Sequence, residues 1–229
     1  MSRTKRLHKG ADEAGPRACD YYATPAWVTA ALMPVLDELS IRTYIDPCAG
    51  DGAILRVIRD HVSKREVPTT VRGYEIRPEA VEQCRLDGLS VRQMDFLDDR
   101  EWPSLVPQIT LRGNICIVMN PPYGGRDNTA QRFIDTSIKR LRAFAGGPSG
   151  RECFVAALLR TMWINDGQAT HRRISWLRET VGMPDVYLLP QRPSFTGRGT
   201  DATTYAWFVW TVSEQTRRTG FVEALEARP

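Results

Sequence analysis

The sequence predicts an α/β fold built on a doubly wound, mostly parallel sheet of seven strands. Apolar segments of strand length alternate along the chain with amphipathic segments of helix length, which is typical of this class. Polar or glycine-rich residues directly follow several of these strands, as they do where open α/β sheets bind ligands. Residues 191–202 join the last two strands and are too few for a crossover helix, so we expect an antiparallel pair there.

The first expected element is a helix within residues 21–39. Thr24 is expected to be its N-cap and Pro25 its first helical residue, a pair that favours a helix start. Apolar residues then recur at helical spacing, at Trp27, Val28, Ala31, Leu32, Val35 and Leu36. Pro34 is expected to kink this helix or to end its regular part.

The middle of the chain alternates strands with helices. Short runs rich in apolar and β-branched residues predict strands at 42–47, 69–76, 90–96 and 114–120. Helical spacing of the apolar residues predicts helices at 52–62 and 78–87. Residues 115–118 are all apolar, so the fourth strand is expected to be buried on both faces.

The second half of the chain continues the pattern. A long amphipathic helix is expected at 129–144 and a further helix at 170–181, with strands at 152–160, 185–190 and 203–212. The glycine-rich stretch 145–150 is expected to be a loop and not a domain boundary.

The length of 229 residues suits one domain. Residues 1–18 are polar and aperiodic, and we expect them to form a flexible basic arm ahead of a single domain at 19–229. The net charge is +4, and residues 1–17 contribute five Lys or Arg against two Asp or Glu, or +3. The overall charge is therefore weak evidence for a nucleic-acid partner.

Composition also argues against several classes of protein. No apolar run approaches the ~20 residues of a membrane helix, and the N-terminus lacks the apolar core of a secretory signal, so a cytoplasmic protein is expected. The five cysteines are odd in number and show no CxxC spacing, and there are only three histidines. We therefore expect neither a disulfide framework nor a metal site, and we expect most cysteines to be core residues.

The first candidate site begins with the stretch DPCAGDG, which follows the first strand and opens a helix. Its residues are Asp46, Pro47, Cys48, Ala49, Gly50, Asp51 and Gly52. The two glycines permit tight turns and a close approach of a ligand to the backbone. The stretch is not GxGxxG and has no phosphate-binding lysine, and its two carboxylates would repel a pyrophosphate. It suits a ligand that carries hydroxyls or positive charge.

Two further acids end the next two strands. Glu75 can accept both hydroxyls of a ribose, and Ile76 beside it can pack on an adenine face. Asp95 can accept a hydrogen bond from an adenine amino group, with Phe96 next to the ring. Together with the first motif they outline an adenosine with a charged, amino-acid-bearing end, which describes S-adenosylmethionine better than a dinucleotide.

The second candidate site is the run Asn120, Pro121, Pro122 and Tyr123 after the fourth strand. The Asn120 side-chain oxygen and the Pro121 carbonyl are two acceptors that can hold one –NH₂ group, and Tyr123 offers a face for stacking a planar ring. An exocyclic base amine is a poor nucleophile because its lone pair is delocalised. Two acceptors can aim that lone pair at a methyl group, so positioning and electrostatics do the catalysis without an obligatory general base.

On these motifs the sequence resembles the S-adenosylmethionine-dependent amino-methyltransferases of the Rossmann-like methyltransferase class. It is most similar to the small adenine-specific DNA methyltransferases of phages and prophages, and the resemblance covers roughly residues 20–212. It implies cofactor contacts from Tyr22, Thr24 and Pro25, which match a Y-x-T-P motif ahead of the first strand. That motif order is the gamma arrangement of DNA methyltransferases.

The resemblance implies an adenine N6-methyltransferase acting on DNA, with double-stranded DNA as the expected partner. Large gamma enzymes carry a separate target-recognition domain, and here little follows Val212, so the reading of the target must come from loops at 124–131, 161–171 and 191–203. These loops supply Arg126, Arg192 and Arg198 for phosphates and Phe195 as a second stacking face. Residues 161–200 carry +2 and residues 81–101 carry −3, so the target side is the more basic one.

Two alternatives remain at this point. NPPY also occurs in methyltransferases that act on guanine in ribosomal RNA and on glutamine in proteins, so RNA or protein is a possible target class. A catalytically inactive nucleic-acid-binding module is the second alternative, against which the intact Asn120 and Asp46 argue. The recognition sequence, a restriction partner and the oligomeric state are not encoded in any motif.

Overall fold

The structure is a computed structural model of the chain. It describes residues 23–102, 113–123, 128–145, 150–165, 170–195, 199, 201–212 and 220–226. Four predictions therefore lie outside the described residues: the basic arm at 1–18 and the roles of Tyr22, Arg126 and Arg198.

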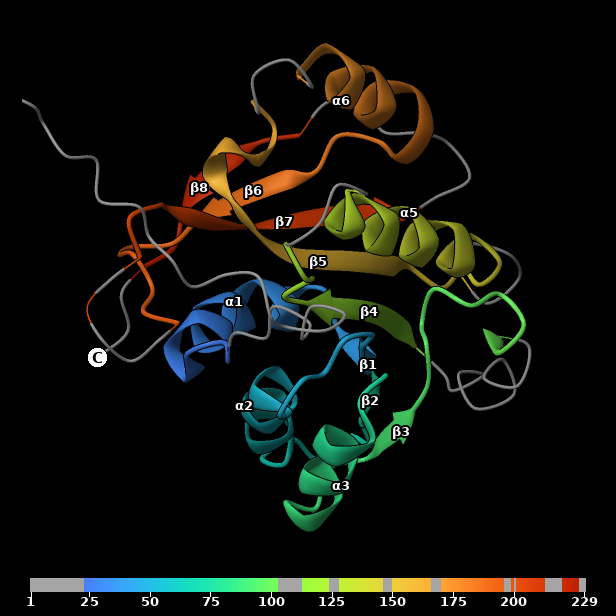
Figure 1. Cartoon of the computed structure of the whole chain (residues 1–229). Helices are drawn as coiled ribbons and strands as arrows, with labels where there is room; N and C mark the ends of the chain where they lie inside the picture. The colour runs from blue at the N-terminus through green and yellow to red at the C-terminus, as the bar shows by residue number, and fades with distance from the viewer. Residues whose placement is uncertain are drawn as a thin grey trace, which may run out of the picture.

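The described residues form one sheet of eight strands in the order β3-β2-β1-β4-β5-β7-β6-β8 (Figure 1). The strands are β1 Ile41–Asp46, β2 Thr70–Glu75, β3 Val91–Gln93, β4 Asn114–Met119, β5 Cys153–Arg160, β6 Asp185–Leu188, β7 Tyr205–Val212 and β8 Val222–Ala224. β1 to β5 are parallel to one another, and β7 is antiparallel to both β5 and β6. The mixed α/β class, the mostly parallel sheet and the antiparallel pair at its end are therefore confirmed.

The prediction of seven strands was wrong by one strand. β8 pairs with β6 in parallel, with Val186 opposite Val222 and Leu188 opposite Ala224. Its three residues are all exposed, so it lacks the apolar alternation that marks a half-buried strand. Backbone hydrogen bonds hold it in place, and the Asp185 carboxylate adds one by accepting from the Phe221 amide at 3.1 Å.

The helices are α1 Ala26–Glu38, α2 Ala53–Val62, α3 Pro78–Leu86, α5 Thr129–Arg142 and α6 Thr170–Trp176, with a 3₁₀ turn at Thr161–Trp163 and a π-helical turn at Leu177–Val181. One expectation about α1 was wrong: Pro25, not Thr24, is its N-cap residue, and none of the described side chains caps the helix. Pro34 lies inside the helix, which extends to Glu38, so the proline does not end it.

Helices cover both faces of the sheet, and the central strand β4 shows why. Ile115, Ile117 and Met119 are completely buried in a cluster that includes the apolar side of α5. Cys116 and Val118 point to the opposite face and pack with α1 and α2. The continuous apolar run of this strand thus supplies two cores at once, as expected for a strand between two helical layers.

The cysteines of the described residues are unpaired, and most of them belong to the core. Cys84, Cys116 and Cys153 are buried, unpaired core residues, whereas Cys48 is half-buried at the end of β1. Within the described ranges, no helix is both long and apolar enough to cross a membrane. In the same part of the chain no group of three or more His, Cys, Asp and Glu side chains is placed to hold a metal ion.

Candidate functional site

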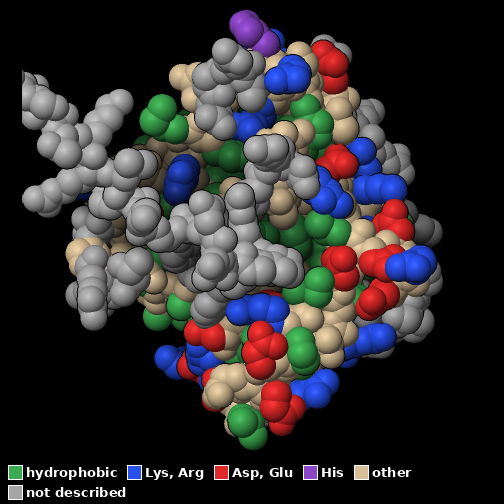
Figure 2. Space-filling model, in the orientation of Figure 1, with side chains coloured by type: hydrophobic (Ala, Val, Ile, Leu, Met, Phe, Trp, Pro, Cys, Tyr) green, Lys and Arg blue, Asp and Glu red, His purple; other side chains and the backbone are tan. Residues whose placement is uncertain are grey.

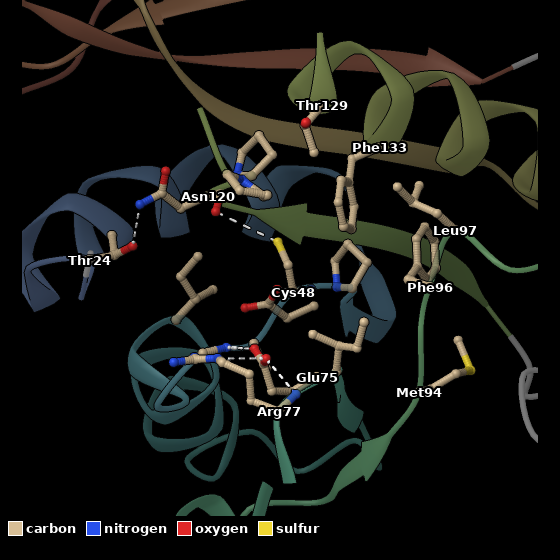
Figure 3. A pocket seen from close by; sticks show the side chains of 18 of the residues that line it. Thr24, Cys48, Glu75, Arg77, Met94, Phe96, Leu97, Asn120, Thr129 and Phe133 are labelled. Carbon is tan, nitrogen blue, oxygen red and sulfur yellow. Dashed lines mark hydrogen bonds and ion pairs between the residues drawn. The ribbon is translucent and has the colours of Figure 1, made fainter. Parts of the chain in front are cut away.

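A cavity of about 280 Å³ lies where β1, β2, β3 and β4 end (Figure 3). The sequence-predicted residues that line it are Thr24, Asp46, Pro47, Cys48, Ala49, Gly50, Asp51, Glu75, Ile76, Asp95, Phe96, Asn120, Pro121, Pro122 and Tyr123. The structure therefore brings the two candidate sites, which were inferred from separate motifs, into one cavity. Pro25, Gly52, Arg192 and Phe195 do not line it.

The glycine-rich turn after β1 shapes the floor of the cavity. Gly50 and Gly52 have φ angles of 58° and 85°, in the left-handed region that favours glycine. A Cβ atom on Gly52 would also lie 2.3 Å from Cδ1 of Leu89, so a side chain does not fit there. Gly52 is the N-cap residue of α2, and its role is thus to turn the chain beneath the cavity.

Asp46 ends β1 and is almost completely buried, with an exposed fraction of 2%. Its Oδ1 accepts a hydrogen bond from the Cys48 amide at 3.1 Å. The pKa of Asp46 is raised to about 7, mainly by burial and in smaller part by the nearby carboxylates of Glu75 and Asp51, while the hydrogen bond from the Cys48 amide opposes the rise. A cationic group placed in the cavity would favour the ionised carboxylate.

Glu75 ends β2 and is held by three donors. Its Oε2 accepts from the Gly50 amide at 2.8 Å, which ties the second strand to the glycine-rich turn. Its Oε1 accepts from both the amide and the Nε of Arg77, each at 3.0 Å, and the latter contact is an ion pair (Figure 3). Glu75 is 6% exposed and lines the cavity, and these three hydrogen bonds orient its carboxylate.

The far wall of the cavity combines one acceptor with apolar surface. Asp95 is exposed, and its Oδ1 accepts from the Leu97 amide at 2.9 Å. Phe96 is buried and stacks on Phe133 of α5 at 5.9 Å between ring centroids. Ile76 is 52% exposed, so an apolar side chain at the cavity remains open to a planar ligand.

Asn120 follows β4, and only the NH₂ group of its side-chain amide has a hydrogen-bond partner among the described residues. Its Nδ2 donates a hydrogen bond to Oγ1 of Thr24 at 3.1 Å (Figure 3). Its Oδ1 is buried and has no hydrogen-bond partner among the described residues. A buried acceptor without a donor is costly, so this oxygen is suited to receive an N–H from a bound molecule.

Tyr123 closes the tetrapeptide and is anchored at both ends. Its hydroxyl donates to the carbonyl of Leu158 in β5, and its ring meets the edge of the Tyr205 ring at 6.1 Å between centroids. Burial raises the pKa of Tyr123 well above its ordinary value. Phe195 also contacts Tyr205 in a T-shaped arrangement, at 5.0 Å between ring centroids, so both predicted stacking residues pack against Tyr205.

Several residues of the site were missed by the sequence reasoning. Arg77, Met94, Leu97, Thr129 and Phe133 also line the cavity. Met94 lies within residues 90–96, which were predicted to form a strand, whereas β3 ends at Gln93; Leu97 lies just after that range. Phe133 lies on the apolar face of α5, and its sequence pattern is the same whether the side chain lines a cavity or packs in the core. Arg77 follows Glu75 by two residues, and this spacing was the one feature of the sequence that could have placed Arg77 at the site.

The predicted target side holds a further arginine. Arg160 ends β5, and its guanidinium carbon lies 5.7 Å from the centroid of the Tyr123 ring. Its Nε donates to the Tyr205 hydroxyl at 3.4 Å, and that hydroxyl donates to Asp201 at 2.8 Å. Arg192 is exposed, and its Nη1 donates to the Ala202 carbonyl at 3.5 Å.

No model of a known family matches the chain, and no curated protein matches it. Among solved structures, it superposes on a protein from Listeria monocytogenes described as a class I S-adenosylmethionine-dependent methyltransferase, with a TM-score of 0.63 and 9% identity. It also superposes on the methyltransferase subunit of a type I restriction-modification system from Streptococcus thermophilus, with a TM-score of 0.54 and 16% identity. A third match is the M protein of the type I restriction enzyme EcoKI, with a TM-score of 0.53 and 16% identity.

These superpositions cover 88%, 88% and 82% of this chain but only 65%, 47% and 43% of the three solved chains. The chain therefore spans about two thirds of the length of the first of these proteins and less than half of the length of the other two. At such low identity the likeness establishes a shared fold, which is the Rossmann-like fold of class I methyltransferases.

Proposed function

We propose that this protein transfers a methyl group from S-adenosylmethionine to the exocyclic N6 amine of adenine in DNA. The observation that carries the proposal is the joint placement of the acidic strand ends and the NPPY tetrapeptide around one cavity. The structural likeness to methyltransferase subunits of type I restriction-modification systems supports DNA as the target. The chain spans less than half of the length of those subunits, so the reaction itself is proposed from the residues of this chain.

The acidic strand ends fit the cofactor by their chemistry. Glu75 would accept hydrogen bonds from the ribose hydroxyls, and Asp95 would accept one from the amino group of the cofactor's adenine. Ile76 would pack against the adenine ring. Asp46 would face the cationic methionyl end, where a positive charge would lower the pKa that burial has raised. The number of carboxylates and the absence of a phosphate-binding lysine both favour this cofactor over a dinucleotide.

Bound S-adenosylmethionine would supply an electrophilic methyl carbon on its sulfonium. The Asn120 Oδ1, which has no donor among the described residues, and the Pro121 carbonyl would accept the two N–H bonds of the target amine. That pair of acceptors would aim the nitrogen lone pair at the methyl carbon; formation of the C–N bond would be balanced by cleavage of the C–S bond, with the electron pair going to sulfur. The extra proton then leaves the nitrogen for water. Placement and electrostatics supply the rate enhancement.

The target adenine would be turned out of the duplex, at a cost of a few kcal/mol for unstacking. Tyr123 would stack on it, and Phe195 would approach from the segment between β6 and β7. Arg192, together with Arg126 and Arg198 of the chain outside the described residues, would contact phosphates.

The decisive experiment supplies methyl-labelled cofactor together with plasmid DNA, ribosomal RNA or total protein as separate substrates. Label in DNA that digests to N6-methyl-2′-deoxyadenosine is the expected result. Label only in RNA or in protein glutamine would replace DNA by that target class. An Asn120→Ala variant should bind cofactor as the parent does and transfer at least a hundredfold more slowly; unchanged transfer would remove Asn120 from the mechanism.

A further inference from the structure

The Glu75 carboxylate is already occupied on the side where a ribose must bind. Oε1 accepts two hydrogen bonds, both from Arg77, and Oε2 accepts one, from the Gly50 amide. A carboxylate oxygen has about two acceptor positions. Oε1 is therefore filled by its own chain, while Oε2 retains one position.

Recognition of a ribose by two hydroxyls requires an open position on each carboxylate oxygen. One of the two Arg77 donors must therefore leave Oε1 before the second hydroxyl can bind. The backbone amide is the fixed donor, because Arg77 is the N-cap residue of α3 in an extended conformation and precedes Pro78. The side chain is the movable donor: it is 26% exposed and lies at the cavity.

We propose that the Arg77 side chain is a displaceable occupant of the ribose site, which must release Glu75 before S-adenosylmethionine binds with both hydroxyls. This inference rests on the proposed function, since it assumes that Glu75 holds the ribose. Arg77 lowers cofactor affinity, because binding through both hydroxyls breaks the ion pair between Arg77 and Glu75. Its removal therefore tightens binding, although a residue that lines a binding cavity would ordinarily be expected to assist it.

Charge alone predicts a different outcome, and the two can be separated. The described residues that line the cavity include the carboxylates of Asp46, Asp51, Glu75 and Asp95 and a single cation, Arg77. If Arg77 acted only through its charge, its loss would favour cationic S-adenosylmethionine and leave the uncharged thioether S-adenosylhomocysteine unaffected. Both ligands carry the same ribose, so displacement of an occupant affects both to a similar degree.

The test is calorimetric titration of the full chain with S-adenosylhomocysteine and with S-adenosylmethionine. Arg77→Met should bind each ligand about three- to tenfold more tightly than the parent. Arg77→Lys keeps a cationic donor for Glu75 and should bind like the parent. Arg85→Met is the matched control: Arg85 is an exposed arginine of α3 with an ion pair to Glu82, and its loss should change neither affinity.

A double variant checks that the effect runs through Glu75. Glu75→Gln should weaken binding of both ligands, and adding Arg77→Met to it should give no further gain, because the ion pair between Arg77 and Glu75 is already absent. Weaker or unchanged binding by Arg77→Met, or a gain for S-adenosylmethionine alone, would overturn the inference. If Arg77→Met unfolds, Arg77→Gln provides the same comparison. A parent protein that binds neither ligand would instead refute the proposed function.

Discussion

The amide of Asn120 is oriented by a single hydrogen bond, from its Nδ2 to the Thr24 hydroxyl. This contact joins the segment before α1 to the end of β4, two parts of the chain that are 96 positions apart in sequence. It leaves the amide oxygen as the group presented to a ligand. Thr24 is thus a positioning residue for Asn120.

Replacing Thr24 by valine removes this hydrogen bond and keeps the shape of the side chain. We expect kcat to fall about two- to tenfold, the cost of one hydrogen bond, while the Kd for S-adenosylhomocysteine stays within twofold. Thr24→Ser keeps the hydroxyl and should restore kcat. Steady-state kinetics together with calorimetry measure both quantities, and a loss of affinity without a loss of kcat would contradict the positioning role.

Asp46 gives the unliganded protein a defined pH dependence. Its pKa in the folded protein is about 7, against an ordinary value of 3.8. Because folding raises the pKa, Asp46 contributes stability that is fully present below about pH 4 and is lost as the pH rises to about 7. At about 1.4 kcal/mol per pKa unit, the loss amounts to about 4 kcal/mol.

An Asp46→Asn variant stays neutral and should lack this dependence. Its free energy of unfolding, measured by urea titration without cofactor, should therefore rise relative to that of the parent between pH 4 and pH 7. A constant difference across this range would show that the carboxylate is ionised throughout. The same variant should bind S-adenosylmethionine more weakly at pH 8, because the cationic end loses its counter-charge.

At the residue scale, the sequence predicted the acceptors of the site but not their neighbours. Asp46, Glu75 and Asp95 each follow a strand, and parallel strands bring their carboxyl ends to one edge, so their meeting at one cavity follows from topology. The bond from Asn120 to Thr24 and the pairing of Arg77 with Glu75 depend on side-chain geometry between segments. No periodicity or spacing carries that information.

Helix α5 fixes the segment that follows β3 through one arginine. Arg140 is 5% exposed and donates hydrogen bonds to the carbonyls of Phe96 and Asp98 and to the Asp99 carboxylate. Its guanidinium carbon also lies 4.6 Å from the centroid of the Phe96 ring and 4.7 Å from that of Trp102. The wall of the cavity at 94–97 thus depends on a helix from a later part of the chain.

Arg140→Met should destabilise the fold by about 2–4 kcal/mol, because it leaves buried carbonyls without donors. It should also weaken cofactor binding, because the segment that carries Asp95 loses its support. Lys139→Met is the control, since the neighbouring Lys139 is 73% exposed and only approaches Asp99 at 3.8 Å. Thermal unfolding and calorimetry compare the two variants, and equal effects would rule out the structural role of Arg140.

At the element scale, prediction succeeded where the apolar pattern was long and failed where it was short. The run of β4 and the amphipathic face of α5 are clear in sequence, and both elements lie where they were expected. β8 has three exposed residues and is defined by its partner β6, so only the sheet itself reveals it. The start of α1 was misplaced because the Thr24 hydroxyl serves Asn120 instead of capping the helix.

Side chains of both charges share the face of the molecule shown in Figure 2. On the face shown in Figure 2, acidic and basic side chains are interspersed around the lower half, and hydrophobic side chains are visible nearer its centre. The local charge beside Tyr123 is the more informative feature. Arg160 lies over that ring and is oriented by Tyr205, which makes it a candidate for a phosphate next to the target base.

Arg160→Gln should weaken DNA binding and lower the slope of log Kobs against log salt by about one, as expected for the loss of one phosphate contact. Binding of S-adenosylhomocysteine should be unchanged, because Arg160 does not line the cavity. Arg85→Gln removes an equal charge from α3 and should leave the slope as it is. Fluorescence anisotropy over a range of salt concentrations measures the slope, and equal slopes for parent and Arg160→Gln would exclude the contact.

The reversal of β7 has a consequence for how such a protein diversifies. β6 and β7 are paired, with Leu188 opposite Ala206, and residues 189–204 connect these two neighbouring strands. A connecting segment of another length could join the ends of these two strands without changing the backbone hydrogen bonds between them. Under the proposed function, exchange of this one segment would change the target preference, while the residues that line the cavity keep their places.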